Sequence, residues 1–111
     1  MYALLMALAV AAAPSPEVKK VMEGAQPRIQ QCYGEVLAKM RRPVPGKVRT
    51  SFVVTPDGYV KDAKLVKKGT TVKDARFNEC VVAVLSTLTF PKPKDGKDHP
   101  QEFPFNLKAI K

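Results

Sequence analysis

The two cysteines of this 111-residue chain each lie inside an apolar helical stripe, and this feature restricts the fold more than any other. In residues 26–40 the apolar side chains recur at intervals of three and four, which is typical of one face of an α-helix. The members of this stripe are Ile29, Cys32, Tyr33, Val36, Leu37 and Met40. Residues 77–88 repeat the same offsets with Phe77, Cys80, Val81, Val84, Leu85 and Leu88. Since each apolar face carries one thiol, we predict two helices that meet through Cys32 and Cys80.

The even number of cysteines favours a disulfide between Cys32 and Cys80 in an oxidising compartment. The sequence contains no Cys-x-x-Cys spacing and no histidine next to either thiol. Neither a redox dithiol nor a zinc site is therefore predicted. The alternative is that both cysteines stay reduced and pack as small apolar residues of the core.

The start of the chain predicts export. Residues 3–13 form an unbroken apolar run with the length of a signal-peptide core, well short of the roughly 20 residues that a membrane-spanning helix needs. We therefore expect residues 1–13 to be a signal peptide and residues 14–111 to be a single domain, periplasmic or secreted, without a transmembrane anchor of its own. A disulfide would persist in such a compartment.

Two stretches predict a β-hairpin. Residues 47–54 alternate between apolar and polar side chains, as a half-buried strand does. The sequence Thr-Pro-Asp-Gly of residues 55–58 predicts a tight turn with a positive φ at Gly58. Residues 59–67 return as a second strand, in which broken alternation suggests a bulge near Lys61 and Asp62.

The remaining elements complete an α+β fold. Pro27 predicts either a kink in the first helix or two separate helices, and Asp74 is expected to cap the second long helix. Residues 92–99 lack apolar periodicity and are expected to form a loop, while residues 102–110 alternate as a third strand. Pro104 favours a position at the sheet edge. The predicted order is α-β-β-α-β, with two main helices packed on one face of a three-stranded antiparallel sheet.

The formal net charge of +9 falls entirely on the part of the chain beyond residue 13. Such a surface favours acidic partners, which include nucleic acid, anionic glycan or lipid, and acidic proteins. If Arg49 shares the outer face of the hairpin with Lys61 or Lys64, these cations form a patch suited to an acidic strand or an anionic envelope polymer. Nucleic acid is disfavoured by the predicted export and by the lack of aromatic residues interleaved with the cations.

No pattern in the sequence indicates catalysis. His99 is the only histidine and lies in the predicted loop, with no serine, cysteine or carboxylate constellation around it. The sequence shows neither a phosphate-binding glycine motif nor a metal-ligand spacing, so we expect no cofactor, no metal and no enzyme activity. The stripe of Phe103, Phe105 and Leu107 is more typical of a core than of a ligand site.

Several short motifs, taken in order, resemble the TonB carboxy-terminal domain superfamily. They are Ile29-Gln-Gln-Cys32-Tyr33, Pro45-Gly46-Lys-Val48, Phe52-Val-Val, Asp57-Gly58-Tyr-Val60, Phe77-Asn-Glu-Cys80-Val81, Phe90-Pro91-Lys-Pro93 and Pro104-Phe105. More narrowly, the chain is similar to the two-cysteine variant at the ends of AgmX/PglI-type proteins, which are associated with bacterial gliding motility. Gly34 departs from this variant, which usually carries glutamate after the tyrosine.

This resemblance implies a small periplasmic domain of the bacterial cell envelope that works by protein–protein contact. In TonB-type domains an extended segment of the partner adds beside the sheet, through the unpaired backbone groups of an edge strand. Phe103, Phe105 and Leu107 of the last predicted strand are candidate partner-binding residues, but Pro104 removes one donor from that edge, so the sequence leaves open which sheet edge binds. The membrane anchor and proline-rich spacer of TonB-type transducers have no counterpart in this sequence. The alternative is that the chain is a basic envelope protein that binds an anionic glycan or lipid through its lysines and arginines.

Overall fold

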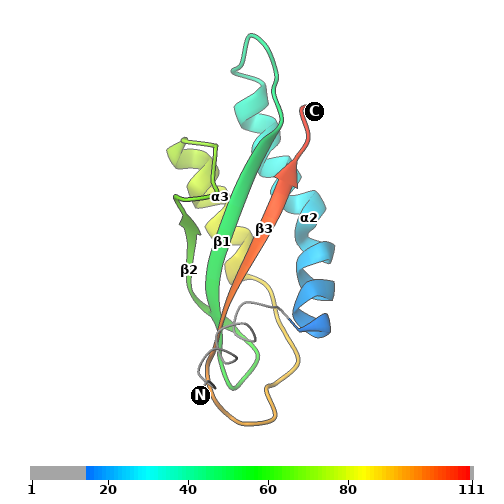
Figure 1. Cartoon of the computed structure of the whole chain (residues 1–111), viewed down its shortest axis with the longest axis vertical. Coiled ribbons are helices and arrows are strands. Elements are labelled where there is room, and N and C mark those ends of the chain that lie inside the picture. The colour runs from blue at the N-terminus through cyan, green and yellow to red at the C-terminus, as the bar shows by residue number, and fades with distance from the viewer. Residues whose placement is uncertain (1–14, 111) are drawn as a thin grey trace, which may run out of the picture.

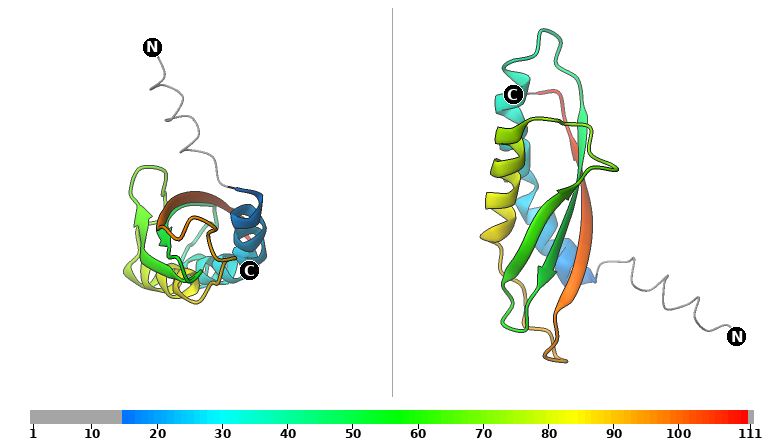
Figure 2. Two further views of the ribbon diagram at one scale, coloured as in Figure 1. Left: turned by 90° about the horizontal axis from the view of Figure 1, so that it is seen from below. Right: turned by 90° about the vertical axis from the view of Figure 1, so that its left-hand side faces the viewer.

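The structure is a computed structural model that describes residues 15–110, and within this range two helices cover one face of a three-stranded sheet. The elements follow the order α2 (Pro16–Leu37), β1 (Gly46–Val54), β2 (Val60–Val66), α3 (Ala75–Ser86) and β3 (His99–Leu107). Figures 1 and 2 show both helices on the same side of the antiparallel sheet, whose strand order is β2-β1-β3. The predicted fold class is therefore confirmed. The expected signal peptide, residues 1–13, lies outside the described residues.

Helix α2 begins at a cap and continues through a proline. Ser15 caps it, since the Val18 amide donates to Ser15 Oγ at 3.3 Å. Pro27 lies inside the continuous helix, so the alternative of two separate helices is wrong. The proline leaves the carbonyl of Glu23 without its helical donor. Because Glu23 and Pro27 are both exposed, water can hydrate that carbonyl, and the helix tolerates the proline.

The turn and the bulge of the hairpin lie where the sequence predicts them. The Gly58 amide donates to the Thr55 carbonyl at 2.9 Å, and Gly58 has a φ of +86°. The pairing of β1 with β2 shifts between Ser51, opposite Lys64, and Val53, opposite Lys61. Asp62 lies in this shift with a φ of +55°, in the left-handed region that a bulge residue often adopts. The predicted third strand is displaced, because β3 begins at His99 and ends at Leu107.

The core lies between the sheet and the two helices. The inward side chains of β1 are all buried, and they are Val48, Thr50, Phe52 and Val54. Thr50 is the polar member of this set, and its hydroxyl donates to the Phe103 carbonyl at 2.7 Å. The apolar stripe of α2 and that of α3 cover this face. Neither helix of the described range is long and apolar enough to cross a bilayer.

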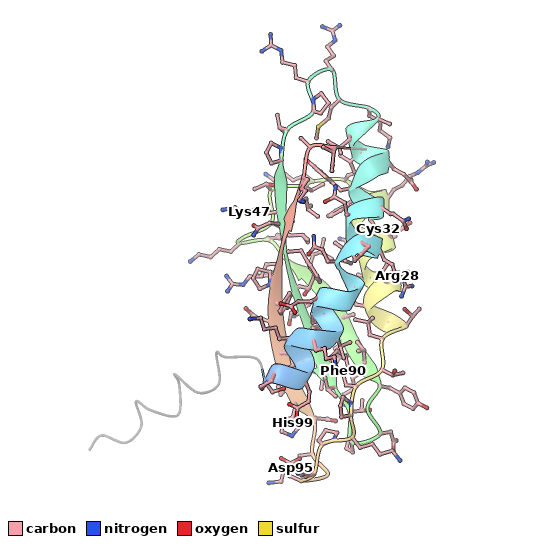
Figure 3. All side chains as sticks on the ribbon, turned by 90° about the vertical axis from the view of Figure 1, so that its right-hand side faces the viewer. Arg28, Cys32, Lys47, Phe90, Asp95 and His99 are labelled. Carbon is pink, nitrogen blue, oxygen red and sulfur yellow. A yellow bond between two sulfur atoms is a disulfide. The ribbon has the colours of Figure 1, made fainter. Side chains whose placement is uncertain are left out.

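The predicted disulfide joins the two helices across the core. Cys32 of α2 is bonded to Cys80 of α3, with a Cα–Cα distance of 5.7 Å and a sequence separation of 48 residues. Cys32 is labelled in Figure 3, on the middle of α2. The alternative of two reduced core cysteines is therefore wrong for this structure. Because the bond closes a long loop, it stabilises the fold mainly by restricting the unfolded chain.

We predict that the Cys32→Ser, Cys80→Ser double variant loses about 4 kcal/mol of the free energy of unfolding, the amount expected for a closed loop of this length. Urea denaturation of the oxidised parent and of the double variant measures the difference. A reducing agent should destabilise the parent by the same amount and leave the double variant unchanged. Equal stability of the two proteins would contradict a structural role of the bond.

We also predict that Gly58→Ala destabilises the protein, because a Cβ at this position would lie 2.3 Å from the Phe90 carbonyl oxygen and the φ is positive. Gly24→Ala is the matched control, since Gly24 is in a helix and its Cβ would meet nothing within 4 Å. The free energy of unfolding of the Gly24→Ala control should rise by about 0.5–1 kcal/mol, because alanine has a higher helix propensity than glycine. Thermal unfolding of both variants checks the prediction, and a stabilised Gly58→Ala protein would contradict it.

Candidate interaction surfaces

The structure places the predicted cations on one face of the sheet. Arg49 is exposed on β1, and Lys64 and Lys61 face the same way because they pair with Ser51 and Val53. Figure 3 shows Lys47, also on β1, projecting away from the helices. The face that the helices leave uncovered is called the outer face below. Arg49, Lys61 and Lys64 therefore share this face, which is the condition stated above for a basic patch, and their role in partner binding stays a prediction.

Two of these cations already have partners within the chain. Arg49 Nε lies 3.2 Å from Glu102 Oε1 on β3, and Lys61 Nζ lies 2.9 Å from Asp98 Oδ2. The Asp98 carboxylate raises the pKa of Lys61, through the hydrogen bond first and the charge second. No ion pair within residues 15–110 involves Lys64. The outer face is thus less positive than its lysines and arginines suggest, and Lys47 and Lys64 are cations of this face without an ion pair in residues 15–110.

The apolar residues nominated on β3 belong to the core. Phe105 is 1% exposed and Leu107 is 2% exposed, so neither side chain is accessible to a partner. Phe103 is half-buried on the same inward face and packs against the core. Their assignment to partner binding is therefore corrected: these side chains hold β3 against the helices. The side chains that β3 exposes are instead those of its outer face, which include Glu102 and Asn106.

The outer edge of β3 lacks much of the hydrogen-bonding capacity that a strand edge normally has. The amides of Lys47 and Arg49 point to the β2 side of β1, where they donate to the hydroxyls of Thr71 and Thr70 at 3.0 Å each. Backbone groups alternate along a strand, so the even-numbered residues of β1 bond the odd-numbered residues of β3. The even-numbered residues of β3 point outward, and two of them are Pro100 and Pro104, which have no N–H.

Two glutamines of α2 occupy the end of the same edge. Gln26 Nε2 donates to the Asn106 carbonyl at 3.0 Å. Gln30 forms two hydrogen bonds with the backbone of Lys108, from Nε2 to the carbonyl and from the Lys108 amide to Oε1, both at 2.9 Å. Together with the prolines, they remove several of the donors and acceptors that strand addition at the β3 edge would use. Sequence reasoning found Pro104 but missed Pro100 and the glutamines, although Gln26 and Gln30 share one helix face by their spacing of four.

The edge formed by β2 is unpaired along its middle and end, whereas a bridge between Tyr59 and Thr89 covers the residue just before the strand. Val66 and Lys64 are paired with Arg49 and Ser51, so their backbone groups point to β1 and those of Leu65 and Ala63 point outward. Within the described part of the chain, no hydrogen bond reaches these outward groups. The right-hand view in Figure 2 looks onto this edge, and no helix crosses it. The sheet therefore has one edge that lacks several backbone donors and acceptors and one edge on which Ala63 and Leu65 are unpaired.

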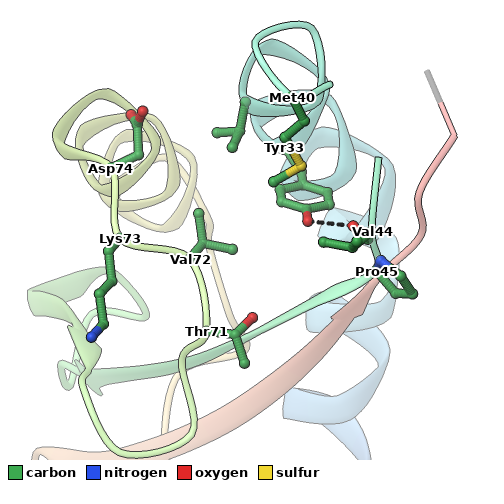
Figure 4. A pocket seen from close by; sticks show the side chains of 9 residues that line it. Tyr33, Met40, Val44, Pro45, Thr71, Val72, Lys73 and Asp74 are labelled. Carbon is green, nitrogen blue, oxygen red and sulfur yellow. Dashed lines mark hydrogen bonds between the residues drawn. The ribbon is translucent and has the colours of Figure 1, made fainter. Parts of the chain in front are cut away.

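A shallow pocket of about 300 Å³ lies between the end of α2 and residues 71–74 (Figure 4). Its lining residues include Tyr33, Val36, Met40, Val44 and Val72. Tyr33 donates its hydroxyl to the Val44 carbonyl at 2.6 Å, and burial raises the pKa of this hydroxyl. Figure 4 shows the charged ends of Lys73 and Asp74 pointing away from the Tyr33 ring. The pocket lining is thus mostly apolar, and the Tyr33 hydroxyl is already bonded to the Val44 carbonyl.

The acidic side chains whose pKa is shifted form hydrogen bonds with nearby residues of the chain. Asp74 caps α3 by accepting from the Phe77 amide at 2.9 Å, and this hydrogen bond lowers the pKa of Asp74. The His99 ring lies 2.9 Å from the Asp95 carboxylate, which lowers the pKa of Asp95, and both side chains are partly exposed. Figure 3 shows this pair at the end of the molecule formed by the loop before β3. Within residues 15–110 no three metal-ligating side chains come together.

Comparisons with protein-family models, with curated proteins and with solved structures gave no match.

We predict that Gln30→Ala destabilises the protein by about 1 kcal/mol, because it removes two exposed hydrogen bonds to the Lys108 backbone. Gln31→Ala is the matched control, since Gln31 is an exposed neighbour on the same helix and the substitution changes helix propensity equally. Chemical denaturation of the two variants should separate them. Equal stabilities would mean that Gln30 does not hold the β3 edge.

Proposed function

We propose that this protein is a non-enzymatic interaction module that captures an extended segment of a partner protein along β2. The observation that carries the proposal is the contrast between the two sheet edges. Prolines and glutamines close the β3 edge, while Ala63 and Leu65 offer outward donors and acceptors on the β2 edge. An open edge of this kind is a template for one additional strand. The edge that the sequence leaves open is thus assigned to β2 in this proposal.

The charges beside β2 indicate an acidic partner segment. A strand added to this edge would place every second side chain on the outer face, next to Lys64 and Lys61. Lys64 has no carboxylate partner within the described range, so an acidic residue in the added strand would supply one. Pairing of two copies through β2 would instead bring these lysines close to one another, and like charges disfavour it. The proposed partner is thus a different, acidic chain.

The proposed location is the periplasm or the outside of the cell. The disulfide between Cys32 and Cys80 supports an oxidising compartment. The resemblance to the two-cysteine variant of the TonB carboxy-terminal domain supports the same location and a partner in the bacterial envelope. The helix pair that the disulfide joins lies on the face opposite the outer face, which leaves β2 accessible (Figure 2).

A second candidate function is binding of an anionic envelope glycan or lipid through the outer face. It is favoured by the cluster of Lys47, Arg49, Lys61 and Lys64 on that face. It is weakened by the ion pairs of Arg49 and Lys61 within the chain. If binding depends on surface charge alone, the affinity for the anionic polymer should fall steeply with salt concentration. A proline substitution in β2 should then leave this affinity unchanged.

We predict that Leu65→Pro weakens binding of a synthetic peptide of alternating glutamate and valine at least about tenfold, because proline removes one outward amide of the edge. Leu65→Ala is the matched control: it also loses the half-buried side chain but keeps the amide. Fluorescence anisotropy of the labelled peptide measures binding, and circular dichroism verifies that both variants fold. Equal binding by the two variants would exclude strand addition at β2.

We further predict that Lys64→Glu weakens binding of the same peptide, whereas Lys20→Glu, with the same change of net charge on the exposed side of α2, does not. The titrations are performed at low and high salt concentration, because the contribution of charge to the binding affinity should decrease as the salt concentration rises. If both reversals weaken binding equally, binding depends on net charge alone. Together with equal binding by the two Leu65 variants, that result would favour the anionic-polymer function.

A further inference from the structure

Residues 38–45 form a loop between α2 and β1 that extends past the sheet, and we call it the tip loop (Figures 1 and 2). Its sequence contains Lys39, Arg41 and Arg42 and no acidic residue. Lys39 Nζ lies 3.6 Å from the Asp74 carboxylate. No ion pair within the described residues involves Arg41 or Arg42, and both are exposed. The tip loop thus presents two adjacent arginines without a counter-charge.

The tip loop also exposes apolar surface. Val44 is 49% exposed and is flanked by the exposed residues Pro43 and Pro45. The two prolines have no N–H, so this part of the loop would leave few backbone donors unsatisfied in an apolar medium. Met40, Val44 and Pro45 also line the apolar pocket of Figure 4, which extends the apolar surface inward. The Tyr33 hydroxyl fixes the loop by donating to the Val44 carbonyl.

We propose that the tip loop docks on the surface of an anionic lipid bilayer. Arg41 and Arg42 would bind lipid phosphates, for which the guanidinium group is suited by its two parallel donors. Val44, with its flanking prolines, would enter the boundary between headgroups and acyl chains. A projecting loop with apolar residues and free cations fits a deformable lipid surface, and its lack of carboxylates avoids repulsion from anionic headgroups.

This site is separate from the proposed binding edge. Ala63 and Leu65 lie along the side of the sheet, while the tip loop lies beyond one end of it (Figure 1). Membrane docking and capture of an extended segment can therefore occur in the same molecule. The proposal does not depend on which partner, if any, binds β2.

The test is co-sedimentation of the full chain with vesicles of phosphatidylcholine, with and without one third phosphatidylglycerol. The Arg41→Ser, Arg42→Ser double variant should bind the anionic vesicles at least roughly tenfold more weakly than the parent. The matched control is Lys67→Ser, Lys68→Ser, which removes two exposed adjacent cations from another loop and changes the net charge equally. The control should bind nearly as well as the parent. The apolar residues 3–13 are common to all variants, so they do not contribute to these differences.

The Val44→Asn variant tests the apolar contribution of the tip loop to membrane binding, because the substitution leaves the charge of the loop unchanged. It should weaken binding to anionic vesicles and leave binding to dextran sulfate, a soluble polyanion, unchanged. Equal losses for the two double variants would overturn the proposal, since they would mean attraction by net charge alone. Full binding by Val44→Asn would also overturn it, because the loop would then act as a polyanion site and not as a membrane site.

Discussion

The position of helix α2 is the constraint on which the rest of this structure depends. On one side the helix is bonded to α3 through Cys32 and Cys80, and on the other side Gln26 and Gln30 bond it to the end of β3. Between these attachments its apolar stripe covers the inward face of the sheet. A helix fixed in this way closes one edge of the sheet and leaves the opposite edge uncovered. The difference between the two edges thus follows from how α2 is held.

This difference determines what the domain can recognise. The β3 edge combines prolines at two outward positions with glutamines bonded to its last carbonyls and amide, so a partner strand would find few groups to pair with. The β2 edge keeps its outward groups at Ala63 and Leu65. Internal ion pairs of Arg49 and Lys61 reduce the charge of the outer face, and Lys64 is the cation on β2 itself that keeps no ion pair within residues 15–110. In the proposed contact, backbone pairing with β2 fixes the position of the partner strand, and the lysines favour a partner with acidic side chains.

Local sequence signals predicted much of this fold because each one acts over a few residues. Asp74 caps α3, the Thr-Pro-Asp-Gly turn forms, and Asp62 lies in the predicted bulge, since caps, turns and bulges depend on neighbouring backbone. The disulfide followed from the phase of Cys32 and Cys80 on two helical faces. A bond between the two cysteines could be expected because the apolar stripes of α2 and α3 both have to pack into one small core.

Features that depend on distant residues could not be predicted in the same way. The start of β3 was placed too late because Pro100 resembles a loop residue, and its outward position becomes evident only from pairing with β1. The alternation of Phe105 and Leu107 is compatible with a core as well as with a binding face, and their burial beneath the helices shows that they belong to the core. The contacts of Gln26 and Gln30 join residues about 80 positions apart, with separations of 80 and 78. No local pattern specifies such a contact.

Amide hydrogen exchange of the free, oxidised protein, measured residue by residue by NMR, tests the unequal edges most directly. The amides of Ala63 and Leu65 should exchange rapidly, while those of Lys64, which points to β1, and of Lys108, which is held by Gln30, should be protected. Protection of Ala63 and Leu65 equal to that of Lys64, or rapid exchange at Lys108, would contradict the assignment of an open β2 edge and a closed β3 edge.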